Sequence, residues 1–169
     1  MYKRQLGGSL ISQKISDVLL SGGGEFAHGL TYSGHPASCA AGLATLDILE
    51  ETGIIEQGVV DLAPYFASRL IELADHPIVG QVRVKGLFAA VELVRDKSIR
   101  ERLAPESAAA VYCRDTAITQ GLMVRQTGDA MILAPPFVTE RSEIDFLVDQ
   151  LAAALDRTGQ HYGVIPTAA

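Results

Sequence analysis

A polar loop at residues 29–36 offers groups that bind phosphate in many proteins. Its hydroxyl side chains are Thr31, Tyr32 and Ser33, glycines flank them, and Pro36 is placed to open a helix. Hydroxyls and the free amides of a helix start both donate hydrogen bonds to phosphate oxygens. The loop therefore indicates a phosphate site, and a helix entry without a ligand remains the alternative.

Arg125 is the second candidate for binding chemistry. The pattern around it predicts a short strand that runs into a turn at residues 126–129. A guanidinium in that place can bind a carboxylate through two parallel hydrogen bonds. A solvated arginine at the edge of a hairpin is the alternative that the residues alone leave open.

Other site chemistries find little support in the sequence. His28, His35 and Cys39 lie near one another, but a metal site needs three or four well-spaced ligands and no fourth is visible, so we predict no metal site. Ser33 lacks the flanking pattern of a hydrolase nucleophile. The glycines at residues 22–24 lack the Lys-Ser/Thr ending of a nucleotide-binding loop.

The elements before residue 54 look like part of a larger unit. Residues 6–12 resemble the end of a buried strand, and residues 15–20 fit a short helix that the following glycines stop. A longer helix is expected from Pro36 to about Gly53. No apolar pattern in these segments predicts a core of their own.

From residue 54 onward the pattern predicts a compact α+β unit. An apolar stripe from Ile55 to Leu73 recurs every three or four residues and marks a long helix. The expected elements after it are strands at 82–84 and 87–93, a helix at 106–120, a hairpin of 122–125 with 130–133, a helix capped by Thr139 and a loose tail after Arg157. This order favours an antiparallel sheet with helices packed on it.

Charge and composition exclude several classes of partner. The 169 residues carry a formal net charge of −6, which disfavours nucleic acid and anionic membrane surfaces. No apolar run reaches the roughly 18 residues that a membrane-spanning helix needs. Two separated cysteines give no disulfide framework. We therefore expect a cytoplasmic protein without nucleic-acid or membrane partners.

Three blocks of sequence resemble a known family. Residues 25–36 read EFAHGLTYSGHP, residues 80–93 contain Gly86-Leu87 and Val91-Glu92-Leu93, and residues 121–136 run from GLMVR to APP. In this order and spacing they resemble the class III aminotransferases, which depend on pyridoxal 5′-phosphate, and the resemblance covers residues 6–157. Within the family the chain is most similar to the ω-transaminases that transfer an amino group from putrescine or a related amine to pyruvate or a similar 2-oxo acid.

The resemblance implies an α/β fold class, namely the C-terminal part of the fold type I architecture of pyridoxal-phosphate enzymes. Residues 1–36 would finish the large cofactor-binding domain, and residues 37–157 would form the interdomain helix and the small C-terminal domain. Residues 158–169 would be a loose tail.

The resemblance also implies roles for particular residues. Thr31, with Tyr32 beside it, would reach across a homodimer to the phosphate of the partner subunit's cofactor. Arg125 would be the mobile arginine that pairs with the substrate carboxylate and swings aside for amines without one. Leu30 stands where related enzymes carry Phe or Tyr, which implies a different wall in the substrate-binding pocket.

The family's Schiff-base lysine has no counterpart in this sequence. It would lie upstream of Met1, and Lys3 does not match it. Since transamination needs that lysine as covalent anchor and as base, the resemblance implies no catalytic residue here. We expect a fragment of a class III aminotransferase that is inactive alone. A non-catalytic α+β binding or interaction module derived from such a domain is the alternative.

Overall fold

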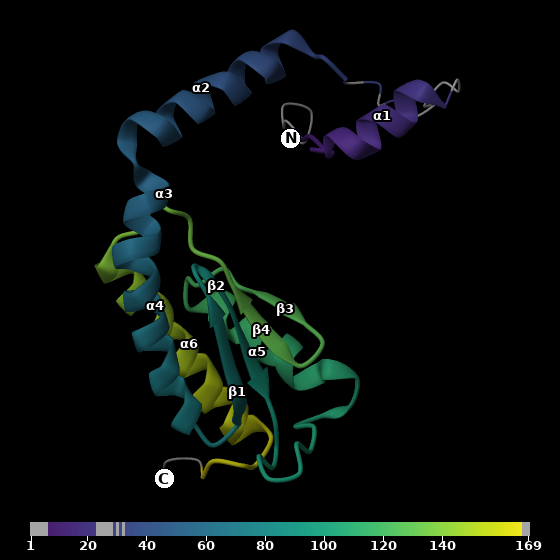
Figure 1. The fold of residues 1–169 in the computed structure, drawn as a ribbon. Helices are drawn as coiled ribbons and strands as arrows, with labels where there is room; N and C mark the ends of the chain where they lie inside the picture. The colour runs from purple at the N-terminus through teal and green to yellow at the C-terminus, as the bar shows by residue number, and fades with distance from the viewer. Residues whose placement is uncertain (1–6, 23–28, 30, 32, 167–169) are drawn as a thin grey trace. The chain divides into compact units, whose positions relative to one another are not determined.

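The computed structural model describes residues 7–22, 29, 31 and 33–166, and it divides the chain into two compact units (Figure 1). The first unit is Met1–Gly53 and the second is Ile54–Ala169. The boundary between the units lies after Gly53, and the helix expected from Pro36 therefore belongs to the first unit.

The described residues of the first unit form two helices. Helix α1 spans Gln13–Ser21, and helix α2 spans Pro36–Thr52. Pro36 suits the first turn of α2 because its missing N–H has no intrahelical acceptor there. Gly53 ends the helix with a φ of 58°, a left-handed conformation that glycine adopts without strain. Both helices were predicted from the sequence.

A strand was expected at residues 6–12, but the described residues of this segment do not form one. Residues 7–12 are irregular, and Leu6 lies outside the described residues. A strand needs a neighbour that accepts and donates its ladder hydrogen bonds, and no described segment pairs with residues 7–12. The apolar pattern alone was insufficient to predict the element.

The second unit begins with a helical rod whose winding changes three times. Its parts are α3 (Ile54–Gln57), the π-helix η2 (Gly58–Leu62), α4 (Ala63–Ile71) and the 3₁₀-helix η3 (Glu72–Asp75). The single long helix expected here is therefore interrupted by a wide turn, and the apolar stripe changes its exposure along the rod. Leu62, Phe66, Leu70 and Leu73 are buried, whereas Ile55 and Val59 are exposed.

A four-stranded antiparallel sheet follows the rod. Its strands are β1 (Val79–Lys85), β2 (Phe88–Leu93), β3 (Arg125–Thr127) and β4 (Ala130–Leu133), in the order β1-β2-β4-β3. The turns joining β1 to β2 and β3 to β4 contain Gly86 and Gly128, whose φ values are 59° and 57°. Both hairpins were predicted, but β3 spans Arg125–Thr127 where a strand at 122–125 and a turn at 126–129 were expected, so the second hairpin has a shorter turn and another register.

Two further helices complete the unit. Helix α5 (Ala108–Thr119) follows the 3₁₀ turn η4 (Pro105–Ser107), and helix α6 spans Arg141–His161. Thr139 was expected to cap the last helix, and this was wrong. Glu140 is the N-cap residue, and it forms a capping box with Glu143, in which each side chain accepts a hydrogen bond from the other residue's backbone amide.

The loose tail predicted after Arg157 is also corrected in its first part. Helix α6 continues to His161, and Thr158 and Gly159 are buried. A Cβ atom on Gly159 would lie 2.5 Å from the Ile165 side chain, so the chain folds back closely over the helix end. The regular spacing of apolar residues in α6 ends at Leu155, so it did not predict this contact. The helix residues buried there are Thr158 and Gly159, which are not large apolar residues.

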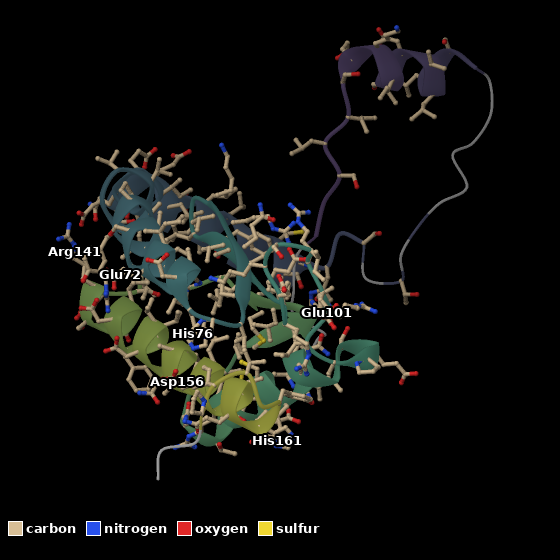
Figure 2. The ribbon with its side chains drawn as sticks, turned by 90° about the horizontal axis from the view of Figure 1, so that it is seen from below. Glu72, His76, Glu101, Arg141, Asp156 and His161 are labelled. Carbon is tan, nitrogen blue, oxygen red and sulfur yellow. The ribbon has the colours of Figure 1, made fainter. Side chains whose placement is uncertain are left out.

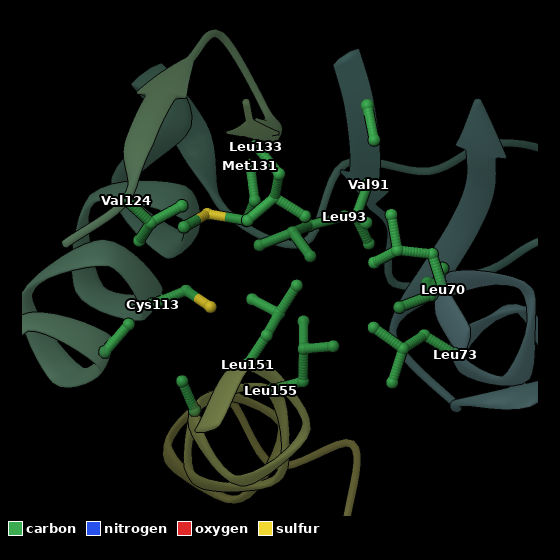
Figure 3. Packing of buried hydrophobic residues seen from close by; sticks show 14 of the residues in the cluster. Leu70, Leu73, Val91, Leu93, Cys113, Val124, Met131, Leu133, Leu151 and Leu155 are labelled. Carbon is green, nitrogen blue, oxygen red and sulfur yellow. The ribbon is translucent and has the colours of Figure 1, made fainter. Parts of the chain in front are cut away.

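Helices and sheet enclose one hydrophobic core in the second unit (Figure 3). Alternate residues of the central strands, among them Val91 and Met131, point to the helices. There they meet Leu70 of α4, Cys113 of α5 and Leu151 of α6. Each fully buried large side chain contributes about 1.5–3 kcal/mol to stability relative to an exposed one, so this core holds the sheet in place.

A polar seam joins α4 to α6 outside the core. The Asp145 carboxylate accepts hydrogen bonds from Tyr65 Oη at 2.6 Å and from Arg69 Nε at 2.8 Å. At the start of α6, Arg141 pairs with Asp61 of η2 and lies over the Tyr65 ring. In Figure 2, Arg141 marks that end of the seam, and the His76–Asp156 pair lies further along α6. These contacts fix the beginning of α6 against the rod.

Candidate functional site

The expected phosphate loop is partly described. Thr31 lies in a turn and is exposed, so its hydroxyl is not buried among packed side chains. Gly34 has a φ of 68°, which a glycine adopts readily. Leu30 and Tyr32, also predicted to belong to this site, lie outside the described residues.

Helix α2 begins directly after this loop, and its first backbone amides have no acceptor within the helix. His35 is its N-cap residue and gives no side-chain cap hydrogen bond, and the first intrahelical bond runs from the Cys39 amide to the His35 carbonyl at 3.0 Å. The amides of Ala37 and Ser38 precede that bond and have no intrahelical acceptor. Hydroxyl, free amides and the positive end of the helix dipole together suit an anionic group such as a phosphate.

Arg125 is the first residue of β3, at the outer edge of the sheet. It pairs with Ile132 of β4, and the same row continues through Ala90 of β2 to Arg83 of β1. Directly paired residues project to one face, so this row lies on the face opposite the core. Arg125 is exposed, and among the residues that the structure describes its guanidinium has no hydrogen-bond or ion-pair partner.

A hollow of about 730 Å³ lies beside Arg125, and the second unit alone lines it. Its walls are mostly apolar, with Phe88 and Met123 on the sheet side and Phe146 on α6. Among the described lining residues, Arg125 and Glu143 carry the only charges. A mostly apolar hollow of this volume with few polar groups is typical of small-molecule sites.

Sequence reasoning identified Arg125 but missed the other side of this hollow. Glu143 and Phe146 enter it from the first turns of α6, a segment that we expected only to pack. The spacing of Glu140 and Glu143 is a capping-box signal and could have placed Glu143 at the helix start. That Glu143 lines the same hollow as Arg125 could not be predicted from local sequence, because it depends on how α6 packs against the sheet.

The described lysines lie outside the hollow at Arg125. They are Lys14, Lys85 and Lys97, and none lines the hollow at Arg125. Lys97 donates to the Ala74 carbonyl at 2.8 Å. Burial raises the pKa of the Cys113 thiol to about 11, which keeps this cysteine protonated and unreactive at neutral pH. None of these side chains offers a nucleophile beside Arg125.

The described residues contain no group of metal ligands and no helix suited to cross a membrane. No group of three His, Cys, Asp or Glu side chains in that part of the chain could hold a metal ion. No described helix combines the length and apolar character needed to cross a membrane.

Comparison with protein families identifies the class to which this chain belongs. The model of the class III aminotransferases matches residues 5–155, which is most of the sequence. The chain is therefore a member of the class III aminotransferase family, and the family resemblance seen in its three motif blocks is confirmed. Enzymes of this class use pyridoxal 5′-phosphate.

Relatives of established activity are aminotransferases. The chain is 44% identical over 153 residues to a putrescine–pyruvate aminotransferase of Pseudomonas aeruginosa, and the match covers 90% of this chain and 33% of that enzyme. It is 40% identical to a vanillin aminotransferase of Capsicum annuum, covering 88% and 33%, and 38% identical to a chloroplastic gamma-aminobutyrate transaminase of Solanum lycopersicum, covering 90% and 30%. The chain thus spans about a third of the length of these relatives.

Solved structures with a similar fold are transaminases. The ω-transaminase of Pseudomonas jessenii, in a complex with PMP, superposes with a TM-score of 0.79 at 35% identity and covers 89% of this chain and 33% of that one. A transaminase from directed evolution by ancestral reconstruction gives a TM-score of 0.82 at 36% identity, covering 89% and 34%. The predicted fold, the C-terminal part of the fold type I architecture, is confirmed.

Proposed function

We propose that this chain forms the C-terminal part of an ω-transaminase that moves an amino group from an amine or diamine to pyruvate or a similar 2-oxo acid. The observation that carries the proposal is Arg125, whose guanidinium has no partner among the described residues and lines a mostly apolar hollow in a chain of this family. Arginine binds a carboxylate through two parallel hydrogen bonds, and pyruvate presents a carboxylate at one end and a methyl group at the other, with the keto carbonyl between them. The hollow offers a guanidinium for the carboxylate and apolar side chains for the methyl group.

The cofactor of the complete enzyme is pyridoxal 5′-phosphate, which accepts and returns the amino group when bound. The residues of the first unit fit its phosphate, since the Thr31 hydroxyl and the first backbone amides of α2, which have no acceptor within the helix, are donors. In this proposal they serve the partner subunit of a homodimer, and Tyr32 shares this role. Leu30 shapes the wall of the amine pocket. Residues 1–36 belong to the cofactor domain and residues 37–157 to the interdomain helix and small domain.

The 169 residues alone are proposed to be inactive. None of the described lysines lines the hollow at Arg125, and Lys3 does not match the family's lysine, so no residue here is positioned to hold the cofactor covalently. The chain by itself contributes carboxylate binding and phosphate binding, and the proton transfers are carried by the large domain.

A chimaera tests the proposal directly. These 169 residues replace the corresponding segment of the P. aeruginosa putrescine–pyruvate aminotransferase, which supplies the large domain. We expect the chimaera to be active, and Arg125→Ala to raise the KM for pyruvate by about 10- to 100-fold, since a hydrogen bond to a charged group contributes about 1.5–3 kcal/mol. Arg83→Ala, in the same sheet row, is the matched control and should leave KM near its original value.

Thr31 is tested in the same chimaera. Thr31→Ala should weaken cofactor retention, measured by dialysis and absorbance, whereas Thr31→Ser, which keeps the hydroxyl, should not. An unchanged KM for pyruvate in Arg125→Ala would refute the carboxylate role, and equal cofactor retention in Thr31→Ala and the parent chimaera would refute the phosphate role.

A further inference from the structure

We infer that Gly58 and Phe137 are positioning residues that set the width of the proposed substrate hollow. Phe137 belongs to a strap of residues 134–139, which lies between β4 and α6 in the chain and forms one wall of the hollow. Its ring lies on Gly58 of the π-helix η2. The inference rests on the proposed function, because it takes the hollow at Arg125 as the substrate site, and it adds a determinant of substrate size that lies outside the hollow.

The strap faces the hollow with most of its residues and η2 with one. Five of its six residues line the hollow, namely Ala134, Pro135, Pro136, Val138 and Thr139. Phe137 is the sixth, and a Cβ atom added to Gly58 would lie 2.6 Å from its Cδ1 atom and 3.2 Å from its Cε1 atom. Figure 1 shows the chain passing from β4 to the rod before α6 begins. The strap therefore has η2 on one side and the hollow on the other.

A proline explains the wide turn on which Phe137 lies. Pro64, at the start of α4, has no amide to donate to the carbonyl four residues back, and its ring would press on that carbonyl in a regular α-helix. The winding widens just before it, where the Ala63 amide bonds to the Gly58 carbonyl five residues back. Such wide turns are frequent at functional sites. Since Gly58 has no side chain, the Phe137 ring approaches the backbone of this turn directly.

The strap is also fixed beyond Phe137. The Thr139 amide donates to the Pro136 carbonyl at 3.0 Å, which closes a turn around Phe137. Two residues after the strap, Arg141 pairs with Asp61, which also belongs to η2. The π-helix thus holds the chain at two points. Because protein interiors contain little empty space, a displaced Phe137 ring moves its neighbours in the turn, and these neighbours line the hollow.

The consequence is that the spacing between η2 and the strap sets the width of the hollow. A methyl group added at Gly58 would push the strap toward the hollow and narrow it. A smaller side chain in place of Phe137 would let the strap settle onto η2 and widen the hollow. Both changes leave the Arg125 guanidinium in place, so acids that share a carboxylate but differ in bulk should respond differently.

Two substitutions with opposite expected effects test the contact. Gly58→Ala adds a methyl group against the Phe137 ring, and Phe137→Ala removes that ring. All three atoms nearest to an added Cβ at Gly58 belong to the ring, so the double variant Gly58→Ala/Phe137→Ala regains room and should restore the behaviour of the parent chain. Val60→Ala is the matched control, because it changes a side chain of η2 that is 78% exposed.

The experiment follows the methionine methyl signals of the 169-residue chain by NMR while pyruvate or the bulkier benzoate is added. Met123 lines the hollow and Met131 is fully buried in the core, so one signal reports binding and the other reports folding. We expect Gly58→Ala to weaken benzoate binding about 3- to 10-fold, the low end of the cost of overpacking, and pyruvate binding less than about twofold. Phe137→Ala should shift the preference between the acids about two- to threefold toward benzoate, because the strap relaxes only partly into the vacated space. Val60→Ala should match the parent.

The outcomes separate this inference from the proposed function. If neither acid moves the Met123 signal of the parent chain, the carboxylate role of Arg125 fails and the inference fails with it. If both acids bind but Gly58→Ala weakens them equally, or if the double variant behaves like Gly58→Ala, the inference alone is overturned. Should Gly58→Ala lose the Met131 signal of a folded core, Phe137→Ala decides, and an unchanged preference between benzoate and pyruvate in that variant overturns the inference.

Discussion

The two units of the chain use apolar residues in opposite ways. Residues 54–166 gather theirs into a core of α4, α5, α6 and the sheet, where Phe66, Leu70 and Leu151 are fully buried. In the described residues of the first unit the only buried side chain is Ser38, while Leu20 is 81% and Leu43 64% exposed. The same residue types therefore stabilise one unit by themselves and leave the other dependent on a further surface.

The difference shows which part of the sequence can fold by burying its own apolar residues. Helices of 9 and 17 residues are marginal in water unless an apolar face is packed, whereas a sheet covered by three helices buries its own apolar surface. The second unit supplies Arg125 and Glu143 from a framework that supports itself. Thr31 depends on a region whose stability must come from contacts outside its own helices.

Limited proteolysis should give the largest contrast. In the 169-residue chain we expect cleavage within helices α1 and α2 to be about two orders of magnitude faster than within residues 54–166, because local opening of these unpacked helices requires little free energy. Cleavage sites and rates can be read by mass spectrometry over a time course. Equal rates in the two units would remove the distinction.

A pair of core and surface substitutions comes next. Leu151→Ala should lower the free energy of unfolding by about 2–5 kcal/mol, because it opens a cavity among fully buried side chains. The matched change Leu46→Ala in α2, where the leucine is 57% exposed, should cost less than about 1 kcal/mol. Urea titrations followed by circular dichroism measure both, and similar losses would contradict the comparison.

The folded-back end of α6 provides a smaller effect. Gly159→Ala should destabilise the second unit by about 1–3 kcal/mol, since its methyl group would overlap Ile165. Gln160→Ala, one position further along the helix, serves as control and should be close to neutral. If Gly159→Ala is stabilising, as expected for a loose helix end, the contact with Ile165 does not form in solution.

The smallest effect is a pH dependence at the α4–α6 seam. The hydrogen bond from Tyr65 and that from Arg69 lower the pKa of the Asp145 carboxyl below its ordinary value. This contribution to stability is present above the unfolded pKa of about 3.8 and is lost as the pH falls through the lower folded pKa. Urea midpoints of the parent chain should therefore fall more steeply between pH 5 and pH 2 than those of Asp145→Asn. Parallel curves would show that the seam does not form.

Much of the second unit could be predicted because its elements are marked locally. Gly86 and Gly128 lie at turns and alternating residues mark β2. The sequence also placed Arg125 in a hairpin strand, but as its last residue, whereas Arg125 begins β3. The π-helical turn at Gly58 could not be predicted, because Phe137, distant in sequence, occupies the space a side chain at Gly58 would need. The irregular residues 7–12 were mistaken for a strand because an apolar pattern does not show whether a second strand is present to pair with them.

Among the candidate site residues the same reasoning holds. Hydroxyls at Thr31 and the guanidinium of Arg125 were identified from type and context. Glu143 escaped notice because its position at the hollow depends on α6 packing against the rod and the sheet. The position of a charge relative to another element is a tertiary property, and capping signals predict only its place on the helix.

The short outer strand β3 has a consequence for how this family can diversify. It is three residues long and bonded on one side only, so substitutions or insertions in its hairpin leave β1, β2 and β4 joined over the core. Selection, or a protein engineer, can therefore rework the position of Arg125 with little risk to folding. With Arg125 in its proposed role, substrate range can change at this strand while the rest of the sheet stays constant.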